Sequence, residues 1–256
     1  MAKPINPGNA VRTGVISALL ASSGADAPLF PLEGNKGFFS AFADQVDSDL
    51  LIQGLKSEHK IATCYMKPYP ACRHIHAPID VALKLRAQGI PPLEEIENIK
   101  IYAYPAAIRT TGNIIEPANV DEAKFSLTYA TAVAFNLGHF TLDDLEDVEH
   151  LCDKVQEWIH KMEIVSDPSL ENRSANIRGS RIEVLLKNGQ IKSEFVALPK
   201  GDPEVPLSEK DLYNKLRSCT QGVFKKEIIE KFYACGIKFE KLDSVGKLLA
   251  YFDNPL

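Results

Sequence analysis

The 256-residue sequence is poor in cysteine and has no closely spaced cysteine pair. Disulfide frameworks normally use an even number of cysteines at regular spacing, and zinc ribbons use CxxC pairs. The sequence therefore predicts neither a disulfide framework nor a zinc ribbon, and we expect reduced thiols. The five cysteines are Cys64, Cys72, Cys152, Cys219 and Cys235.

Long hydrophobic runs are also missing. A membrane-spanning helix needs about 20 consecutive apolar residues, and no run in this chain approaches that length. The first eight residues, MAKPINPG, lack the apolar stretch of a signal peptide. These absences predict no association with a membrane and a cytoplasmic location.

An excess of positive charge is absent as well. The chain carries 29 Lys and Arg against 34 Asp and Glu, which gives a formal net charge of -5. This balance repels a phosphate backbone, so it argues against nucleic acid as the main partner. Apolar residues make up 45% of the chain, a share that is typical of folded globular proteins and excludes wholesale disorder.

Motifs that bind nucleotides or metals do not occur. The early glycines match neither GxGxxG nor GxxxxGK[ST]. The acidic run 143–147 misses the spacing of an EF-hand loop and fits the first turn of a helix better. Cys72, His74 and His76 alternate as metal ligands in an extended segment would, but no second ligand cluster accompanies them. We therefore expect no nucleotide cofactor and no metal.

The first part of the chain, residues 1–62, is predicted to be helical. An extended stretch at 3–8 leads into helical patterns at 9–23 and 37–46. The apolar faces of these two helices find no partner within the segment, so we expect them to pack against a helical segment elsewhere in the assembly. These faces carry Val11, Val15, Leu19, Phe38 and Phe42.

Residues 63–198 contain both helical patterns and the alternating pattern of strands. Asn188-Gly189 is the strongest short hairpin signal in the chain, and it predicts a partly antiparallel sheet. Residues 199–256 turn helical again from Ser208, which begins a pattern typical of a capping box. The fold class is therefore α+β, flanked by helices. The expected strands are 96–104, 162–165, 177–186 and 190–198, and the expected helices are 78–88, 125–137 and 143–160.

Chemistry-bearing side chains are densest at 67–76, KPYPACRHIH. If the two prolines keep this segment extended, Cys72, His74 and His76 share one face. Cationic donors beside a neutral imidazole suit a carboxylate substrate whose proton is moved. Spacing alone, however, favours a proline-rich loop with ordinary surface side chains. A Cys-His nucleophile pair is the weakest alternative, because no local protease signature surrounds Cys72.

Several segments resemble motifs of the MmgE/PrpD family. Residues 67–80, KPYPACRHIHAPID, are similar to the family's KPYPxCxxxHxxID. The start of the chain from Lys3 is similar to KPxxxGxAxxxG, and 32–38 to LEGxxGF. Residues 124–130, KFSLTYA, resemble RFSLPYA, and 200–208 resemble KGDPExPLS. These ordered motifs extend over nearly the whole chain.

The resemblance implies a fold and an activity. The family's 2-methylcitrate dehydratases, cis-aconitate decarboxylases and iminodisuccinate epimerases act on di- and tricarboxylates without a metal or organic cofactor. It implies a lid-type α+β domain at 63–198, with 1–62 and 199–256 belonging to an all-helical domain that is incomplete here. A homodimer is the usual assembly. We expect dehydration of a 2-methylcitrate-type substrate, with decarboxylation or epimerisation as the alternatives.

The resemblance also implies the site residues. Lys3 and Lys67 match lysines at the family's substrate site, and Arg73 is a further substrate contact. His76 and Tyr129 match the motif histidine and tyrosine, which donate, accept or orient a proton. Lys67 would also stabilise enediolate-like charge, and so act in catalysis.

The chain differs from the family in length, because family members are much longer. Helices that precede the Lys-Pro motif in longer members carry additional active-site groups, which have no counterpart here. The alternatives are therefore a natural fragment, one subunit of a split enzyme whose partner is a separate helical chain, an inactive remnant that serves only as an interaction subunit, or a carboxylate-binding module without turnover.

Overall fold

The computed structural model describes residues 2–172, 174–175 and 177–253. The chain divides into two units, Met1–His59 and Lys60–Leu256. The first boundary predicted from the sequence, between residues 62 and 63, lies three residues further along the chain. The predicted separation of the C-terminal helices from the α+β domain stays a prediction.

The first unit contains three helices, α1 (Ala2–Ser22), α2 (Phe38–Phe42) and α3 (Ser48–Ile52). The prediction of an extended stretch at 3–8 is wrong, because α1 already begins at Ala2. Prolines close to a helix N-terminus cost little, since the first four amides of a helix have no intrahelical acceptor. Only Pro7 lies further inside the helix.

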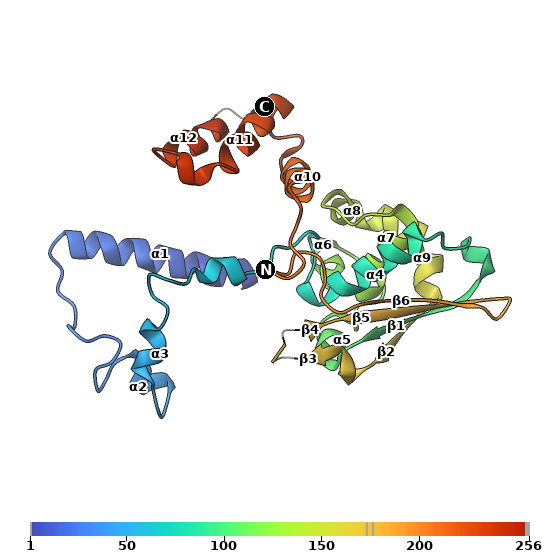
Figure 1. Ribbon diagram of the computed structural model, residues 1–256, viewed down its shortest axis with the longest axis horizontal. Coiled ribbons are helices and arrows are strands. Elements are labelled where there is room, and N and C mark those ends of the chain that lie inside the picture. The colour runs from blue at the N-terminus through green and yellow to red at the C-terminus, as the bar shows by residue number, and fades with distance from the viewer. Residues whose placement is uncertain (1, 173, 176, 254–256) are drawn as a thin grey trace. The chain divides into compact units, whose positions relative to one another are not determined.

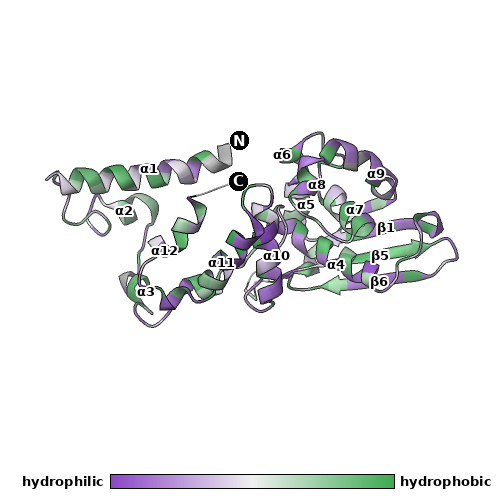
Figure 2. Cartoon of the chain, turned by 90° about the horizontal axis from the view of Figure 1, so that it is seen from above, coloured by the Kyte–Doolittle hydropathy of each residue, from purple (hydrophilic) through white to green (hydrophobic). Residues whose placement is uncertain are grey.

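Large apolar side chains of the first unit are exposed to solvent. Val11 is 67% exposed, Leu19 62% and Phe42 77%. Figure 2 shows hydrophobic residues along α1 and α2. Within this unit the described side chains bury no core residue, which agrees with the expectation that these helices lack an apolar partner.

A four-stranded sheet organises the second unit, in the order β2-β1-β5-β6. The central strand β1 (Ile96–Ala103) pairs in parallel with β2 (Met162–Ser166) and antiparallel with β5 (Ser180–Leu186). The hairpin partner of β5 is β6 (Ile191–Val196), and Gly189 in their turn has φ +84°. A short ribbon joins β3 (Glu171–Asn172) and β4 (Ile177–Arg178). The partly antiparallel sheet and the Asn-Gly hairpin are confirmed.

Helices pack on this sheet. The helix α4 (His76–Ala87) contacts β5, β6 and α7 (Leu127–Leu137). The helix α7 in turn packs on α9 (Val148–His160). Figure 1 shows these three helices on one side of the strands. Alternate residues of β1 and β5 are buried beneath them, and Phe135 of α7 stacks on Trp158 at a ring-centroid distance of 5.5 Å. This is the α+β class that the sequence predicted.

The predicted helix 143–160 is interrupted. It forms α8 (Asp143–Glu146) and α9, with Asp147 between them at φ -100° and ψ 30°. Aspartate favours helix ends because its side chain competes for backbone hydrogen bonds. The remaining short helices are α5 (Pro105–Thr111) and α6 (Val120–Ala123), with 3-10 turns at Lys60–Thr63, Arg73–Ile75, Leu93–Glu95 and Pro168–Leu170.

The C-terminal segment forms α10 (Glu209–Thr220), α11 (Lys226–Gly236) and α12 (Gly246–Leu249), with 3-10 turns at Phe239–Lys241 and Ala250–Phe252. Ser208 and Asp211 form the predicted capping box at the start of α10. Among the described residues, no helix has the length and apolar character needed to cross a membrane.

Candidate active site

The segment 67–76 folds differently from its predicted extended form. Arg73–Ile75 is a 3-10 turn, and α4 begins directly at His76. His74 therefore bonds to the Tyr104 hydroxyl, whereas His76 bonds to Arg73. The predicted common face of Cys72, His74 and His76 does not form, and the described residues hold no cluster of metal-ligating side chains.

Arg73 joins this segment to the turn at 199–202. Its guanidinium forms an ion pair of 2.5 Å with Asp202, and the two side chains are only 9% and 7% exposed. The same group donates to the carbonyl oxygens of Pro199 and Lys200, each at 3.3 Å. The guanidinium of Arg73, expected as a substrate contact, is thus engaged by groups of the protein itself. We call this set of contacts the Arg73 clasp.

Asp80 makes a second connection between the same two segments. It accepts hydrogen bonds from the Tyr69 hydroxyl at 2.5 Å and from the Lys200 amide at 2.6 Å. Burial raises the pKa of the Asp80 carboxyl, and these donors oppose that rise. At Gly201, φ is +91° and an added Cβ would lie 1.9 Å from the Met66 carbonyl oxygen, so only glycine fits there.

His76 is fully buried beside the clasp. Arg73 can only donate, so its contact of 2.9 Å makes Nδ1 of His76 the acceptor and places the proton of the neutral ring on Nε2. That Nε2 lies 3.4 Å from the carbonyl oxygen of Ala71, which also accepts from Lys67 Nζ at 3.1 Å. Burial, followed by the charge of Arg73, lowers the pKa of His76 to about 3. His76 is therefore a neutral ring with both nitrogens occupied.

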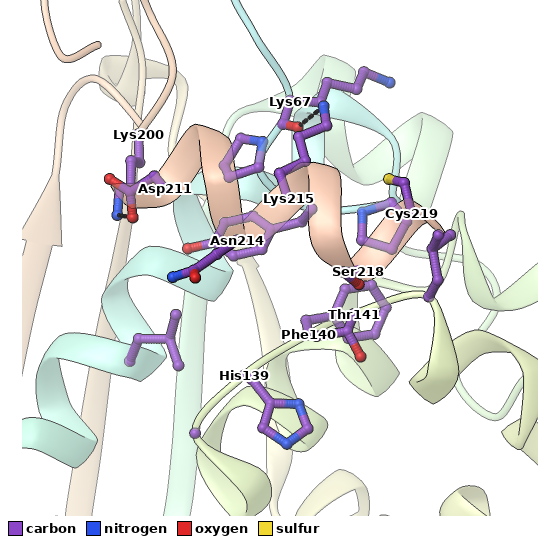
Figure 3. A pocket seen from close by; sticks show the side chains of 16 residues that line it. Lys67, His139, Phe140, Thr141, Lys200, Asp211, Asn214, Lys215, Ser218 and Cys219 are labelled. Atoms are coloured by element: carbon purple, nitrogen blue, oxygen red, sulfur yellow. Dashed lines mark hydrogen bonds and ion pairs between the residues drawn. The ribbon is translucent and has the colours of Figure 1, made fainter. Parts of the chain in front are cut away.

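A cavity of about 650 Å³ lies between the 67–70 segment, the loop 138–142 and α10. Its charged lining consists of three lysines, Lys67, Lys200 and Lys215, and one acid, Asp211. Figure 3 shows Lys215 reaching from α10 to the Lys67 backbone, whose carbonyl oxygen accepts its Nζ at 2.5 Å. Asp211 accepts from Lys200 Nζ at 2.6 Å, and the Lys200 and Ser208 contacts lower the pKa of Asp211 to about 2. The lining is therefore basic overall.

The structure brings together only part of the predicted site. Lys67, Arg73 and His76 lie side by side, and Lys67 lines the cavity. Tyr129 lies apart from them, because it is fully buried in α7 and its hydroxyl donates to the Asp144 carbonyl at 2.6 Å. The side chain of Lys3 falls outside the described residues.

Three cavity residues escaped the sequence analysis. Lys200 begins the segment that resembles KGDPExPLS, so the motif itself was an available signal. Lys215 lies one turn of helix beyond Asp211, yet nothing in the sequence indicates that α10 lies against residue 67. His139 comes directly after Gly138, the left-handed cap of α7, and no sequence pattern marks it.

The fold and the site define an α+β domain with a basic cavity suited to small anions. The family model of the MmgE/PrpD C-terminal domain matches residues 69–235. The chain therefore belongs to the MmgE/PrpD family.

Characterised relatives extend the match to the whole chain. It is 22% identical over 274 residues to cis-aconitate decarboxylase of Aspergillus terreus, covering 100% of this chain and 55% of that protein. The enzyme of the same name from Mus musculus is 24% identical over 263 residues, covering 99% and 52%. That of Homo sapiens is 24% identical over 262 residues, covering 99% and 53%. The chain spans about half the length of the curated relatives it matches.

Removing the acid of the Arg73 clasp should destabilise the second unit. Asp202→Asn leaves the buried guanidinium without its counter-charge, a loss of about 3–5 kcal/mol in free energy of unfolding. Urea denaturation followed by fluorescence of Trp158, the single tryptophan, measures it. In the control Asp243→Asn, the lost partner is the exposed Lys247, so the change should stay within about 0.5 kcal/mol. Equal effects of both variants would contradict a structural role for the clasp.

His76 should stay neutral in the folded protein down to about pH 4, whereas in concentrated urea it should titrate near its ordinary pKa of about 6.5. Between these pKa values the folded state binds fewer protons than the unfolded state. The contribution of His76 to stability is therefore complete above pH 6.5 and is lost as the pH falls toward 3. Nitrogen-15 NMR of the imidazole reports both titration and tautomer. A folded-state midpoint near 6.5, or a proton on Nδ1, would refute the assignment.

Proposed function

We propose that the cavity binds a di- or tricarboxylate and that this chain supplies the basic side of a lyase site that moves protons without a metal or organic cofactor. The observation that carries this proposal is the charged lining of the cavity, three lysines against one aspartate. Ammonium groups in a partly enclosed space attract carboxylates and repay their desolvation.

The same lysines suit the chemistry. When a proton leaves a carbon next to a carboxylate, negative charge moves onto that carboxylate, and fixed cations stabilise it. Lys67 is the best placed for this role, because the Ala71 carbonyl fixes its ammonium beside His76. His76 orients rather than exchanges protons, since Arg73 occupies its one acceptor nitrogen. Lys3 stays a predicted carboxylate ligand.

Two reactions fit this site. Dehydration of a 2-methylcitrate-type substrate is the reaction that we expect from the family resemblance, because the dehydratases are the family's broadest class. Cis-aconitate decarboxylation is the reaction named for the relatives in three species. Both reactions use a tricarboxylate substrate, and in both of them negative charge develops next to a carboxylate, where the lysines can stabilise it. We propose the dehydration as the first candidate and the decarboxylation as the second, with iminodisuccinate epimerisation tested beside them.

A helical partner is part of the proposal. Val11, Val15 and Leu19 recur every fourth residue along α1 and are each more than half exposed, so they present an apolar stripe. A helical segment corresponding to the half of the family that this chain does not cover, or a second copy of the chain, would bury that stripe. An interaction subunit without catalytic activity is the competing function, and these same faces favour it.

Lys67→Ala should lower turnover by at least about 100-fold while leaving the fold intact, because it removes the cation at the reacting carboxylate. Product formation from 2-methylcitrate, citrate, cis-aconitate and iminodisuccinate is followed by NMR, with Trp158 fluorescence as the check on folding. Lys187→Ala, at the exposed β5–β6 turn, is the matched control and should retain full activity.

The assay is run with the chain alone and with a helical protein that corresponds to the uncovered half of the family. Turnover only in the mixture supports the partner proposal. Unchanged turnover by Lys67→Ala would refute the role of Lys67. No product from folded wild-type protein under either condition would refute the lyase function and leave the interaction subunit.

A further inference from the structure

His139 is a cavity residue in a geometry that differs from that of His76. It follows Gly138, where α7 ends in a left-handed cap at φ +80°, and the next residue, Phe140, is buried and fixes the loop. The His139 side chain is 52% exposed and forms part of the cavity lining. Figure 3 places it on the 138–142 loop, apart from α10 and the lysines.

Asp144 holds the His139 ring in place. One oxygen of this carboxylate, Oδ2, lies 3.0 Å from His139 Nδ1 and also accepts from the amide and the hydroxyl of Thr141, at 2.6 and 3.0 Å. The Asp144 side chain is only 6% exposed, and its backbone carbonyl accepts from Tyr129. A carboxylate with this many donors acts as an acceptor, so Nδ1 of His139 carries the proton. Nε2 of His139 is therefore the nitrogen whose lone pair can accept a proton.

Among the described residues, Asp144 is the one hydrogen-bond partner of the His139 ring. His76, by contrast, has its acceptor nitrogen occupied by Arg73 and no exposed surface. Of the two histidines at the site, only His139 thus combines solvent access, an oriented ring and an available basic nitrogen. An imidazole fixed by a buried carboxylate is a recurrent arrangement for proton transfer, because the carboxylate sets the tautomer and stabilises the imidazolium.

We propose that His139 is the residue that exchanges a proton with the carboxylate substrate in this cavity and that Asp144 is its positioning residue. The inference rests on the proposed function, and it names the proton-transfer group of that site. Nε2 of His139 takes a proton from the carbon next to a substrate carboxylate, and the electron pair of the broken C–H bond moves onto that carboxylate. The lysine ammoniums stabilise the resulting enediolate, and the imidazolium returns its proton to carbon in the reverse step.

Deuterium exchange tests this step directly. Wild-type protein is incubated in deuterated water with citrate, 2-methylcitrate or cis-aconitate, and proton NMR measures deuterium entering the carbon positions. His139→Gln should lower the exchange rate at saturating substrate by at least about 100-fold, with KM changed by less than about threefold. His160→Gln is the control, because His160 is 61% exposed, bonds to Glu116 and lies outside the cavity lining. It should exchange at the wild-type rate.

Asp144→Asn tests whether Asp144 acts on the His139 ring or only stabilises the fold. The amide oxygen takes the place of Oδ2, so it still accepts from Thr141 and from His139 Nδ1, but it carries no charge and no longer stabilises the imidazolium. Nitrogen-15 NMR of His139 should therefore still show the proton on Nδ1, and the exchange rate should fall without a change in KM. An unchanged exchange rate would overturn the role of Asp144.

The possible failures are distinguishable. If His139→Gln exchanges at the wild-type rate while Lys67→Ala does not exchange, the His139 assignment is overturned and the proposed function stands. If folded wild-type protein exchanges deuterium into none of the three acids, either alone or mixed with the helical protein, both are overturned. Slow exchange in His139→Gln with normal exchange in His160→Gln supports both.

Discussion

A buried ion pair between Arg73 and Asp202 is the interaction on which the site depends. The two residues are 129 positions apart in sequence, and their side chains are almost fully removed from water. Breaking such a pair leaves an uncompensated buried charge, so the clasp has to form whenever the native fold forms. It brings the 199–202 turn against the 67–76 segment, and Asp80 repeats the connection through Tyr69 and the Lys200 amide.

The Arg73 clasp affects both the His76 ring and the lining of the cavity. Its guanidinium occupies Nδ1 of His76 and, together with burial, keeps that ring neutral, which is the basis of the orienting role that we propose for His76. The anchored turn places Lys200 on the cavity wall, and residues 203–208 connect it to α10, whose Lys215 bonds to the Lys67 backbone. One buried pair thus gathers three cations from three separate segments. On the opposite loop, His139 is oriented by a different buried carboxylate, Asp144.

Local chemistry explains which features were predictable from sequence. The β5–β6 hairpin followed from Asn188-Gly189, and the α10 start followed from Ser208 and Asp211, because both signals act over a few residues. The prolines at the start of α1 favour an extended backbone in isolation, but they cost little near a helix N-terminus, so the helical start was not predictable from them. The 3-10 turn at Arg73–Ile75 was missed because it is set by tertiary contacts to the 199–202 turn. The family motifs led to Lys67, Arg73 and His76, but no motif marked His139 or Lys215, whose positions depend on contacts distant in sequence.

The central claim is that the clasp assembles a cavity that binds carboxylates. The most direct measurement is a titration of the isotopically labelled chain with citrate, followed by amide chemical shifts. The account predicts saturable shifts that cluster at Lys67, Lys215 and the loop 138–142, and their loss in Lys67→Ala. Shifts that fail to saturate, or that cluster on the strands of the sheet away from these residues, would contradict it.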